Sequence, residues 1–430
     1  MLSTYSIADE FKRLRATTLE IVEPLEKDDY TVQTAPYVSP PKWHLGHTSW
    51  LFERLLEQVD RNYKADDQEF SKYLNSYYNK FGDQHDKASR GSVSRPTTDE
   101  LLTYYGKITD KMTRLLEAGR LDESTRKIIE IGIHHECQHQ ELLVYDIQHI
   151  LAENYKPKIR KPVPEAASVK QRQVAVDGGI YSMGYSGKGF CYDIEMPEHK
   201  VYLNDYKIDA FPVSAGDYIK FIESGGYEDY KHWLSDGWDA VSKNKWKAPM
   251  YWYWENGAWH VNDFLGRRKV DPNEPVCHVS FYEADAYCKW TGRRLPSEAE
   301  WEKAACWNEE KQVKTIFPWG NDVPTESHAN LLESRLWGCS KIGSYPNGTS
   351  HYGCHQMIGD VWEWTSSEFV GYPGFRSGFS EYNDKWFTNQ KVLRGGSFAT
   401  PQNSIRGSYR NFFRLDERWM FSGFRCAEDS

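Results

Sequence analysis

The sequence HHECQHQE at residues 134–141 decides the fold of the first part of the chain. It lies within residues 122–149, whose apolar periodicity predicts a long helix. His135 and His139 are four residues apart, so their rings project from one helical face and can bind one metal ion. A bare pair of this kind is common, and a polar, partly buried helix face is the alternative interpretation. His134 is a rival ligand, although it lies one step off that face.

Residues 135–139 also match the HEXXH pattern of zinc proteases. In that pattern the glutamate, here Glu136, acts on a water molecule bound to the metal. The match predicts a catalytic role for Glu136 only if its carboxylate lies close to the metal.

Three other segments among the first 150 residues have the same helical periodicity: 7–21, 41–55 and 105–115. The second of them follows the helix-start signal SPP at residues 39–41, in which we expect Ser39 to be the cap. Four helices with longer connections predict a four-helix bundle, whose core can hold a metal between facing helices.

The sequence WHLGHTSW at residues 43–50 contains two candidates for a third metal ligand. His47 lies on an apolar stripe with Leu51 and Leu55, whereas His44 does not. A third histidine from a second helix would complete a site of three nitrogens, which suits iron, copper or zinc better than magnesium or calcium. Taken alone, His47 also fits a hydrogen-bonded histidine of the core.

The composition of the chain excludes several classes of protein. Its 430 residues are enough for two or three domains. With 53 basic and 62 acidic residues, the net charge of −9 argues against binding to nucleic acid or to anionic membranes. No apolar run approaches the roughly 20 residues of a membrane span, and the N-terminus lacks the features of a signal peptide. The eight cysteines have no regular spacing, so we expect reduced thiols and a cytoplasmic protein.

The chain changes character after its first third. Residues 154–173 are rich in proline, lysine and arginine and indicate a linker between a helical domain, 1–153, and a second domain, 174–430. The second domain has short aromatic and β-branched runs separated by glycine, asparagine and proline, which predict an α+β fold with many loops. Only residues 215–224 and 280–290, with a second helical turn at 297–305, are expected to be helical there.

Between the two histidine segments lie residues that suit oxidative chemistry. Tyr77 and Tyr78 have phenols that can donate a proton or an electron near an oxidising metal. Arg90 and Arg95 can each hold a carboxylate with two hydrogen bonds. Packing for the tyrosines and solvation for the arginines are the alternative interpretations.

Together these features resemble a known two-domain family. Residues 43–50 and 135–141 resemble the DinB-like helical domain of ergothioneine-pathway sulfoxide synthases. Residues 174–428 resemble the formylglycine-generating-enzyme (sulfatase-modifying-factor) domain, a C-type-lectin-like fold. The matching strings are VDGGIYSMG, IEMPEHKVYL, PVCHVSFYEADAYCKWTGRRLPSEAEWEKAA, PWG, MIGDVWEWTSS, VLRGGSF and FSGFRCA. The resemblance implies a DinB-like four-helix bundle followed by a C-type-lectin-like domain, an α + (α+β) chain.

The resemblance also implies the chemistry. It implies a non-haem Fe(II) held by His47, His135 and His139, with O2 as co-substrate. The reaction joins the sulfur of a cysteine thiol to the imidazole of hercynine (Nα-trimethylhistidine) and oxidises that sulfur to the sulfoxide. By the same resemblance, Gln138 contacts the imidazole substrate, and the segment Asn411, Phe412 and Phe413 lines the substrate site.

Two departures from the family pattern point to the thiol substrate. Family members that use γ-glutamylcysteine carry a tryptophan and an aspartate after the asparagine, and an arginine four residues beyond the aspartate. Here the three places hold Phe412, Phe413 and Glu417, with Arg418 one place later. The branch with this pattern resembles enzymes that use free cysteine and take their catalytic phenol from a tyrosine pair. In that branch Tyr77 or Tyr78 is the expected phenol, and Arg90 and Arg95 are expected to hold the cysteine carboxylate.

Other functions stay open at this point. The substrate pair could include plain histidine, as in ovothiol-type enzymes, or a selenium donor, as in selenoneine-type enzymes. A zinc-dependent DinB-like thiol transferase and a ligand-binding module without catalysis are the other candidates. Formylglycine generation is the least favoured, because residues 407–413 lack the cysteine pair of its copper-binding members. The expected partners are small molecules, namely hercynine and cysteine or a related thiol, with neither nucleic acid nor membrane.

Overall fold

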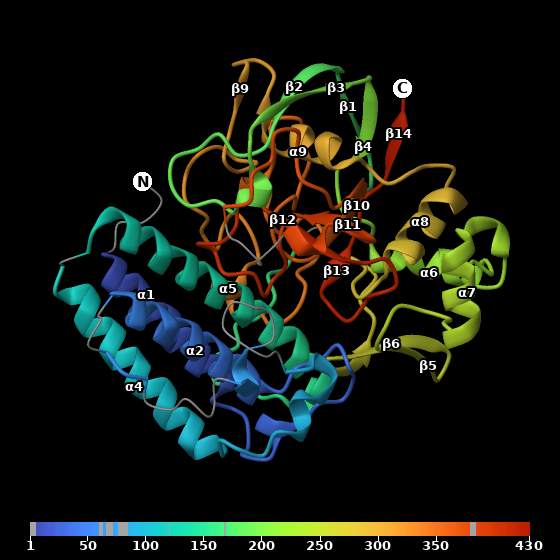
Figure 1. Ribbon diagram of the computed structural model, residues 1–430. Coiled ribbons are helices and arrows are strands. Elements are labelled where there is room, and N and C mark those ends of the chain that lie inside the picture. The colour runs from blue at the N-terminus through green and yellow to red at the C-terminus, as the bar shows by residue number, and fades with distance from the viewer. Residues whose placement is uncertain are drawn as a thin grey trace. The chain divides into compact units, whose positions relative to one another are not determined.

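A computed structural model describes residues 6–59, 63–65, 72–75, 85–119, 121–166, 169–378 and 384–430. The chain forms two compact units, residues 1–159 and 160–430 (Figure 1). The division falls inside the segment that the composition indicates as a linker. Among the described residues, no helix or strand lies between Asn154 and Gln173.

Four long helices build the first unit: α1 (Ile7–Val22), α2 (Pro41–Val59), α4 (Thr98–Glu117) and α5 (Glu123–Leu151). Helix α1 contacts α4 and α5, and α2 contacts the same two helices, so the four close into a bundle. The aromatic rings of Phe11 on α1 and Phe52 on α2 meet edge to face, with centroids 5.0 Å apart. The predicted helical first domain is therefore confirmed.

Helix starts in this unit are set by side-chain caps. Thr97 and Glu100 form a reciprocal capping box at α4, and Asp122 caps α5. Ser39 behaves differently from our expectation, because its hydroxyl accepts a hydrogen bond from Nη1 of Arg90 (2.6 Å). Its backbone N–H donates to Oδ2 of Asp146 (2.8 Å). Ser39 thus ties α2 to α5 and to the segment around Arg90.

The second unit combines short sheets with four helices in its described residues. The helices are α6 (Ala215–Glu223), α7 (Ser235–Asn244), α8 (Phe281–Trp290) and α9 (Glu298–Cys306). Helix α7 was not expected from the sequence. Three sheets are antiparallel meanders or hairpins: β2 (Gly179–Met183) with β3 (His199–Leu203), β5 (Trp252–Glu255) with β6 (Ala258–Asp263) and β7 (Gly266–Lys269), and β8 (Trp307–Asn308) with β9 (Val313–Lys314).

The remaining two sheets bring distant parts of the chain together. One has the order β1 (Gln173–Val176), β4 (Tyr206–Asp209), β14 (Ala427–Asp429), which pairs the start of the unit with its end. The other has the order β12 (Arg410–Arg414), β11 (Gln390–Arg394), β10 (Trp362–Glu368), β13 (Ser422–Gly423). The mixture of helices and small sheets confirms the predicted α+β second domain.

Buried arginines hold the four-stranded sheet against α9. Arg394 on β11 and Arg410 on β12 both bond to the carboxylate of Glu298, and Nε of Arg410 lies 2.7 Å from its Oε1. Arg394 also forms an ion pair with Glu302. A buried guanidinium is tolerated only when it is paired, so these contacts fix the position of β12, on which Asn411 lies.

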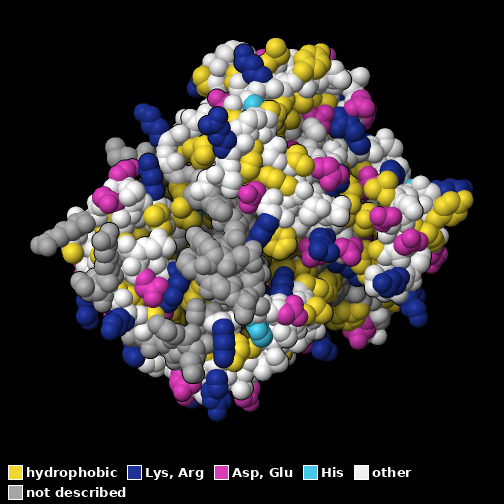
Figure 2. Space-filling model, viewed as in Figure 1, with side chains coloured by type: hydrophobic (Ala, Val, Ile, Leu, Met, Phe, Trp, Pro, Cys, Tyr) yellow, Lys and Arg dark blue, Asp and Glu magenta, His cyan; other side chains and the backbone are white. Residues whose placement is uncertain are grey.

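Basic and acidic side chains are mixed over the face shown in Figure 2. The net charge of −9 is therefore not gathered into one visible patch on that face. Among the described residues, no helix combines the length and the apolar composition needed to cross a membrane.

Candidate metal centre

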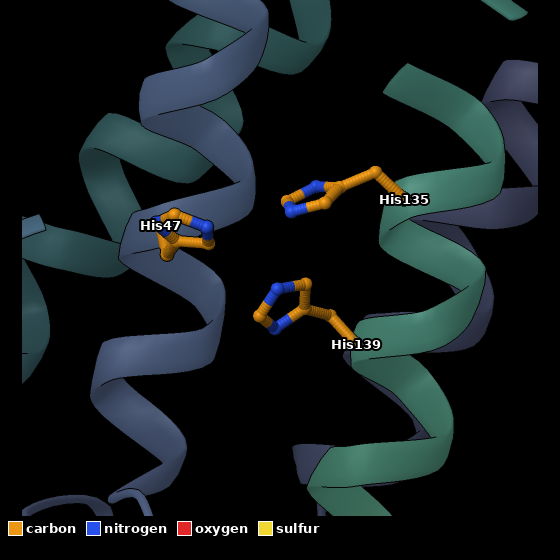
Figure 3. Close-up of side chains that lie close together, drawn as sticks. All are labelled: His47, His135 and His139. Carbon is orange, nitrogen blue, oxygen red and sulfur yellow. The ribbon is translucent and has the colours of Figure 1, made fainter. Parts of the chain in front are cut away.

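Three histidines of the first unit lie around one point in the bundle. Figure 3 shows the ring of His47 on α2 facing the rings of His135 and His139 on α5. One nitrogen from each ring lies within 4.8 Å of the others, and all three side chains are buried. The ring centroids are 5.1 Å apart for His47 and His135, 4.9 Å for His47 and His139, and 4.5 Å for His135 and His139. The arrangement is that of a three-nitrogen metal site.

The ring of His47 is held from two sides. Its Nδ1 lies 2.6 Å from the carbonyl oxygen of Leu74, which can only accept, so Nδ1 carries the hydrogen. In a neutral ring the lone pair is then on Nε2. Trp43 stacks on the ring with centroids 4.6 Å apart, and the guanidinium of Arg90 lies 3.3 Å from the Trp43 centroid. His47 thus has a fixed tautomer and a fixed plane.

The buried environment favours the neutral form of all three histidines. Burial, followed by the neighbouring histidines, lowers the pKa of His47 and His139 well below the ordinary value. Burial lowers the pKa of His135 to about 3. Neutral imidazoles are the form that binds metal, and three nitrogens without a carboxylate suit iron, copper or zinc. The donor set therefore fits the iron that the resemblance implies.

The two rival histidines lie beside this centre. His44 contacts a member of the triad: its Nδ1 is 2.9 Å from Nδ1 of His139. Its Nε2 is 2.8 Å from Oδ2 of Asp146. His134 is buried on α5, one residue before His135. Of the described residues, only His47, His135 and His139 form a group of three or more side chains that could hold a metal ion.

The carboxylate of Glu136 is bound by residues of α1 and α4 rather than offered to a metal-bound water. Its carboxylate accepts hydrogen bonds from Nη1 of Arg15 (2.9 Å), the hydroxyl of Thr18 (2.7 Å) and the hydroxyl of Tyr105 (3.0 Å). Arg15 and Glu136 are 1% and 0% exposed. The glutamate therefore neutralises a buried arginine between α1, α4 and α5, which is a structural role and not the one that the HEXXH pattern permitted.

The predicted substrate residues of the first unit occupy different environments. Gln138 is half-buried on α5, between His135 and His139 in the sequence. Arg90 is 2% exposed, on the 3-10 helix Lys87–Ser92, and Arg95 is exposed. Tyr77 and Tyr78 lie outside the described residues.

A further cation near these arginines was missed in the sequence. Lys42, in the first turn of α2, donates from Nζ to the carbonyl oxygens of Val93 (2.7 Å) and Pro96 (3.2 Å). Burial, and then the charge of Arg95, lowers the pKa of Lys42. In the sequence, only the position of Lys42 directly before the segment WHLGHTSW could have marked it as a residue near the candidate metal centre.

The predicted substrate segment of the second unit lies on the edge strand β12. Asn411, Phe412 and Phe413 are all half-buried. Phe412 stacks on Phe369 with centroids 4.0 Å apart, and Oδ1 of Asn411 accepts from the N–H of Phe412 (2.9 Å). Downstream, Nη1 of Arg418 donates to Oε1 of Glu283 (2.8 Å).

Comparison with known proteins identifies the family. The DinB superfamily model matches residues 10–143, and the sulfatase-modifying factor enzyme 1-like domain model matches residues 159–430. A hercynine oxygenase of Mycolicibacterium smegmatis is 31% identical over 453 residues, and the match covers 100% of both chains. A hercynine oxygenase of Mycobacterium tuberculosis is 31% identical over 437 residues, again covering 100% of both. This chain belongs to the hercynine oxygenase family.

Membership of the hercynine oxygenase family makes the chain an oxidoreductase and confirms the DinB-like and C-type-lectin-like domain pair. A formylglycine-generating enzyme of Mus musculus is also similar, at 30% identity over 292 residues, but that match covers only 60% of this chain. The pair of domains, rather than the second domain alone, therefore identifies the family.

Proposed function

We propose that this protein is an Fe(II)- and O2-dependent sulfoxide synthase that joins the sulfur of cysteine to the imidazole of hercynine. One observation carries the proposal: three buried histidines, with one ring nitrogen of each within 4.8 Å of the others, in a chain matched over its full length by hercynine oxygenases. The reaction removes one hydrogen from the imidazole carbon and one from the thiol. One oxygen atom of O2 becomes the sulfoxide, and the other leaves as water with both hydrogens.

His47, His135 and His139 would hold the iron. The ion, when bound, supplies the site at which O2 is reduced, and three protein ligands leave further positions for the substrates. The protein orients the ligands in advance, because the carbonyl of Leu74 sets the tautomer of His47 and Trp43 fixes its plane. Side-chain packing also keeps bulk water away from the centre, since all three histidines are buried.

The positive residues of the first unit support the cysteine substrate. The guanidinium of Arg90 stacks on Trp43, and Trp43 stacks on His47. The pKa of His47 is lowered mainly by burial and by His135, and the charge of Arg90 lowers it further. Lys42 and Arg95 lie close enough for the charge of Arg95 to lower the pKa of Lys42. We propose that Arg90 and Arg95 bind the cysteine carboxylate beside the metal, where opposite charge stabilises an anion.

The remaining roles follow from chemistry. Gln138 is proposed to hydrogen-bond the imidazole, because its amide can both donate and accept. The aromatic rings of Phe412 and Phe413 suit the quaternary ammonium of hercynine through cation–π attraction. The phenol of Tyr77 or Tyr78 is proposed to donate a proton during sulfur oxygenation. Arg418 forms an ion pair with Glu283, which supports the proposal that it does not serve as the arginine of γ-glutamylcysteine users.

Mass spectrometry of the products tests the proposal. The protein is purified without oxygen, loaded with Fe(II) and mixed with O2, hercynine or histidine, and cysteine, γ-glutamylcysteine or selenocysteine. The expected product is the hercynine–cysteine sulfoxide, with oxygen uptake that requires both substrates. Preferred use of histidine, of a selenium donor or of γ-glutamylcysteine would overturn the substrate assignment. Turnover with zinc and without oxygen uptake would overturn the oxygenase assignment.

A further inference from the structure

A buried chain of hydrogen bonds connects one ligand histidine to a carboxylate on the same helix. Nδ1 of His139 lies 2.9 Å from Nδ1 of His44, and Nε2 of His44 lies 2.8 Å from Oδ2 of Asp146. His44 is on α2, whereas His139 and Asp146 are on α5, so the chain crosses between the helices. The three residues are 2%, 5% and 1% exposed for His44, His139 and Asp146.

We infer that His44 and Asp146 are positioning residues that fix which ring nitrogen of His139 is presented to the metal. The inference rests on the proposed role of His139 as a metal ligand. His44 and Asp146 would not contact the metal themselves, and they would affect its binding only by setting the tautomer of His139.

The direction of the hydrogen bonds follows from the carboxylate. Oδ2 of Asp146 accepts from the backbone N–H of Ser39 and faces the ring of His44, so Nε2 of His44 is the donor. In a neutral His44 ring, Nδ1 then has the lone pair and accepts from Nδ1–H of His139. His139 is left with its lone pair on Nε2. The carboxylate therefore sets the tautomers of two successive rings.

This arrangement has a consequence for metal binding. A hydrogen bond from the other ring nitrogen of a ligand histidine fixes the ring and raises its basicity. The reverse arrangement, with Nδ1–H of His44 donating to His139, places a hydrogen on Nε2 of His139. That form cannot bind a metal through Nε2 without losing the hydrogen. Loss of such a partner typically lowers metal affinity by roughly 10–100-fold.

Two substitutions of Asp146 distinguish its role as a hydrogen-bond acceptor from the effect of its negative charge. Asp146→Leu removes the acceptor, whereas Asp146→Asn keeps one oxygen that can face Ser39 and His44. Gln140→Leu is the matched control. Gln140 is buried, directly follows His139, and donates to the carbonyl of Leu14 (2.9 Å) and the hydroxyl of Thr18 (3.0 Å). Its loss weakens the bundle without touching the chain of hydrogen bonds.

The first measurement uses the metal-free protein with 15N-labelled histidine. Long-range 1H–15N spectra distinguish the two ring nitrogens, and the signals of His139 are assigned by their loss in His139→Gln. We expect the Nδ1–H form for His139 in the wild-type, Asp146→Asn and Gln140→Leu proteins. A mixture of the two forms is expected in Asp146→Leu. An Nε2–H form in the wild-type protein would overturn the inference, whether or not any variant folds.

The second measurement titrates Fe(II) and Zn(II) against a competing chelator. We expect a roughly 10–100-fold loss of affinity in Asp146→Leu, most of it restored in Asp146→Asn. Gln140→Leu should stay within about twofold of the wild-type protein. Wild-type affinity in a folded Asp146→Leu protein would overturn the inference. A wild-type protein that binds neither metal would refute the proposed function instead, and the spectra of the metal-free protein would still decide the role of Asp146.

Discussion

Replacing Glu136 with Gln separates a structural role from a catalytic one. The substitution keeps the shape of the side chain but leaves Arg15 as an uncompensated buried charge, since Arg15 and Glu136 are 1% and 0% exposed. Removing one partner of a buried ion pair costs about 3–5 kcal/mol. For a unit of this size each kcal/mol corresponds to roughly 2–4 °C, so we expect the unfolding temperature of the helical unit to fall by about 6–20 °C.

Thermal unfolding followed by circular dichroism at the helical signal measures this change. The matched control is Glu123→Gln on the same helix, because Glu123 pairs with Lys127 at an exposed position and such pairs contribute about 0–1 kcal/mol. The double variant Arg15→Met with Glu136→Leu should recover most of the lost stability, since an apolar pair of similar volume replaces the ion pair. Below its unfolding transition, Glu136→Gln should keep the wild-type metal content. A Glu136→Gln protein with wild-type stability and no turnover would refute the reasoning and restore Glu136 as a base.

Three further predictions concern the reaction itself. Replacing Tyr77 and Tyr78 with Phe, singly and together, should shift the product from sulfoxide toward cysteine sulfinate while oxygen uptake persists; sulfoxide formation at the normal rate in the double variant would contradict this. Replacing Arg90 or Arg95 with Gln should raise the KM for cysteine by roughly 10–150-fold, equivalent to about 1.5–3 kcal/mol for a hydrogen bond to a charged group, and an unchanged KM would exclude that arginine from the carboxylate site. Removing metal with a chelator should stop oxygen uptake, and Fe(II) should restore it whereas Zn(II) should not.

Much of the bundle could be predicted from the sequence because local signals agree there. Caps such as Thr97 and Asp122 begin helices whose apolar residues repeat at helical spacing. Helix α7, Ser235–Asn244, lacked such a signal. Only Gly237 and Val241 of its ten residues are buried, so no apolar stripe marks it in the sequence.

The metal site was partly predictable for a related reason. The spacing of His135 and His139 within one helix is a local signal, and it indicates a shared face. The contact of His44 with Asp146 joins residues 102 positions apart, and that of Glu136 with Arg15 joins residues 121 positions apart. Such contacts depend on how the helices pack, so the motif alone permitted a catalytic Glu136 that the structure places elsewhere.

The metal content of histidine variants tests the central claim most directly. The full-length protein and its His47→Ala, His135→Ala, His139→Ala and His134→Ala variants are purified without oxygen, loaded with Fe(II) and desalted, and iron is counted per chain. We expect about one iron per chain in the wild-type protein and in His134→Ala, the buried neighbour outside the triad, and a loss of iron in the other three. A His47→Ala protein that keeps its iron, or a His134→Ala protein that loses it while folded, would contradict the three-histidine centre.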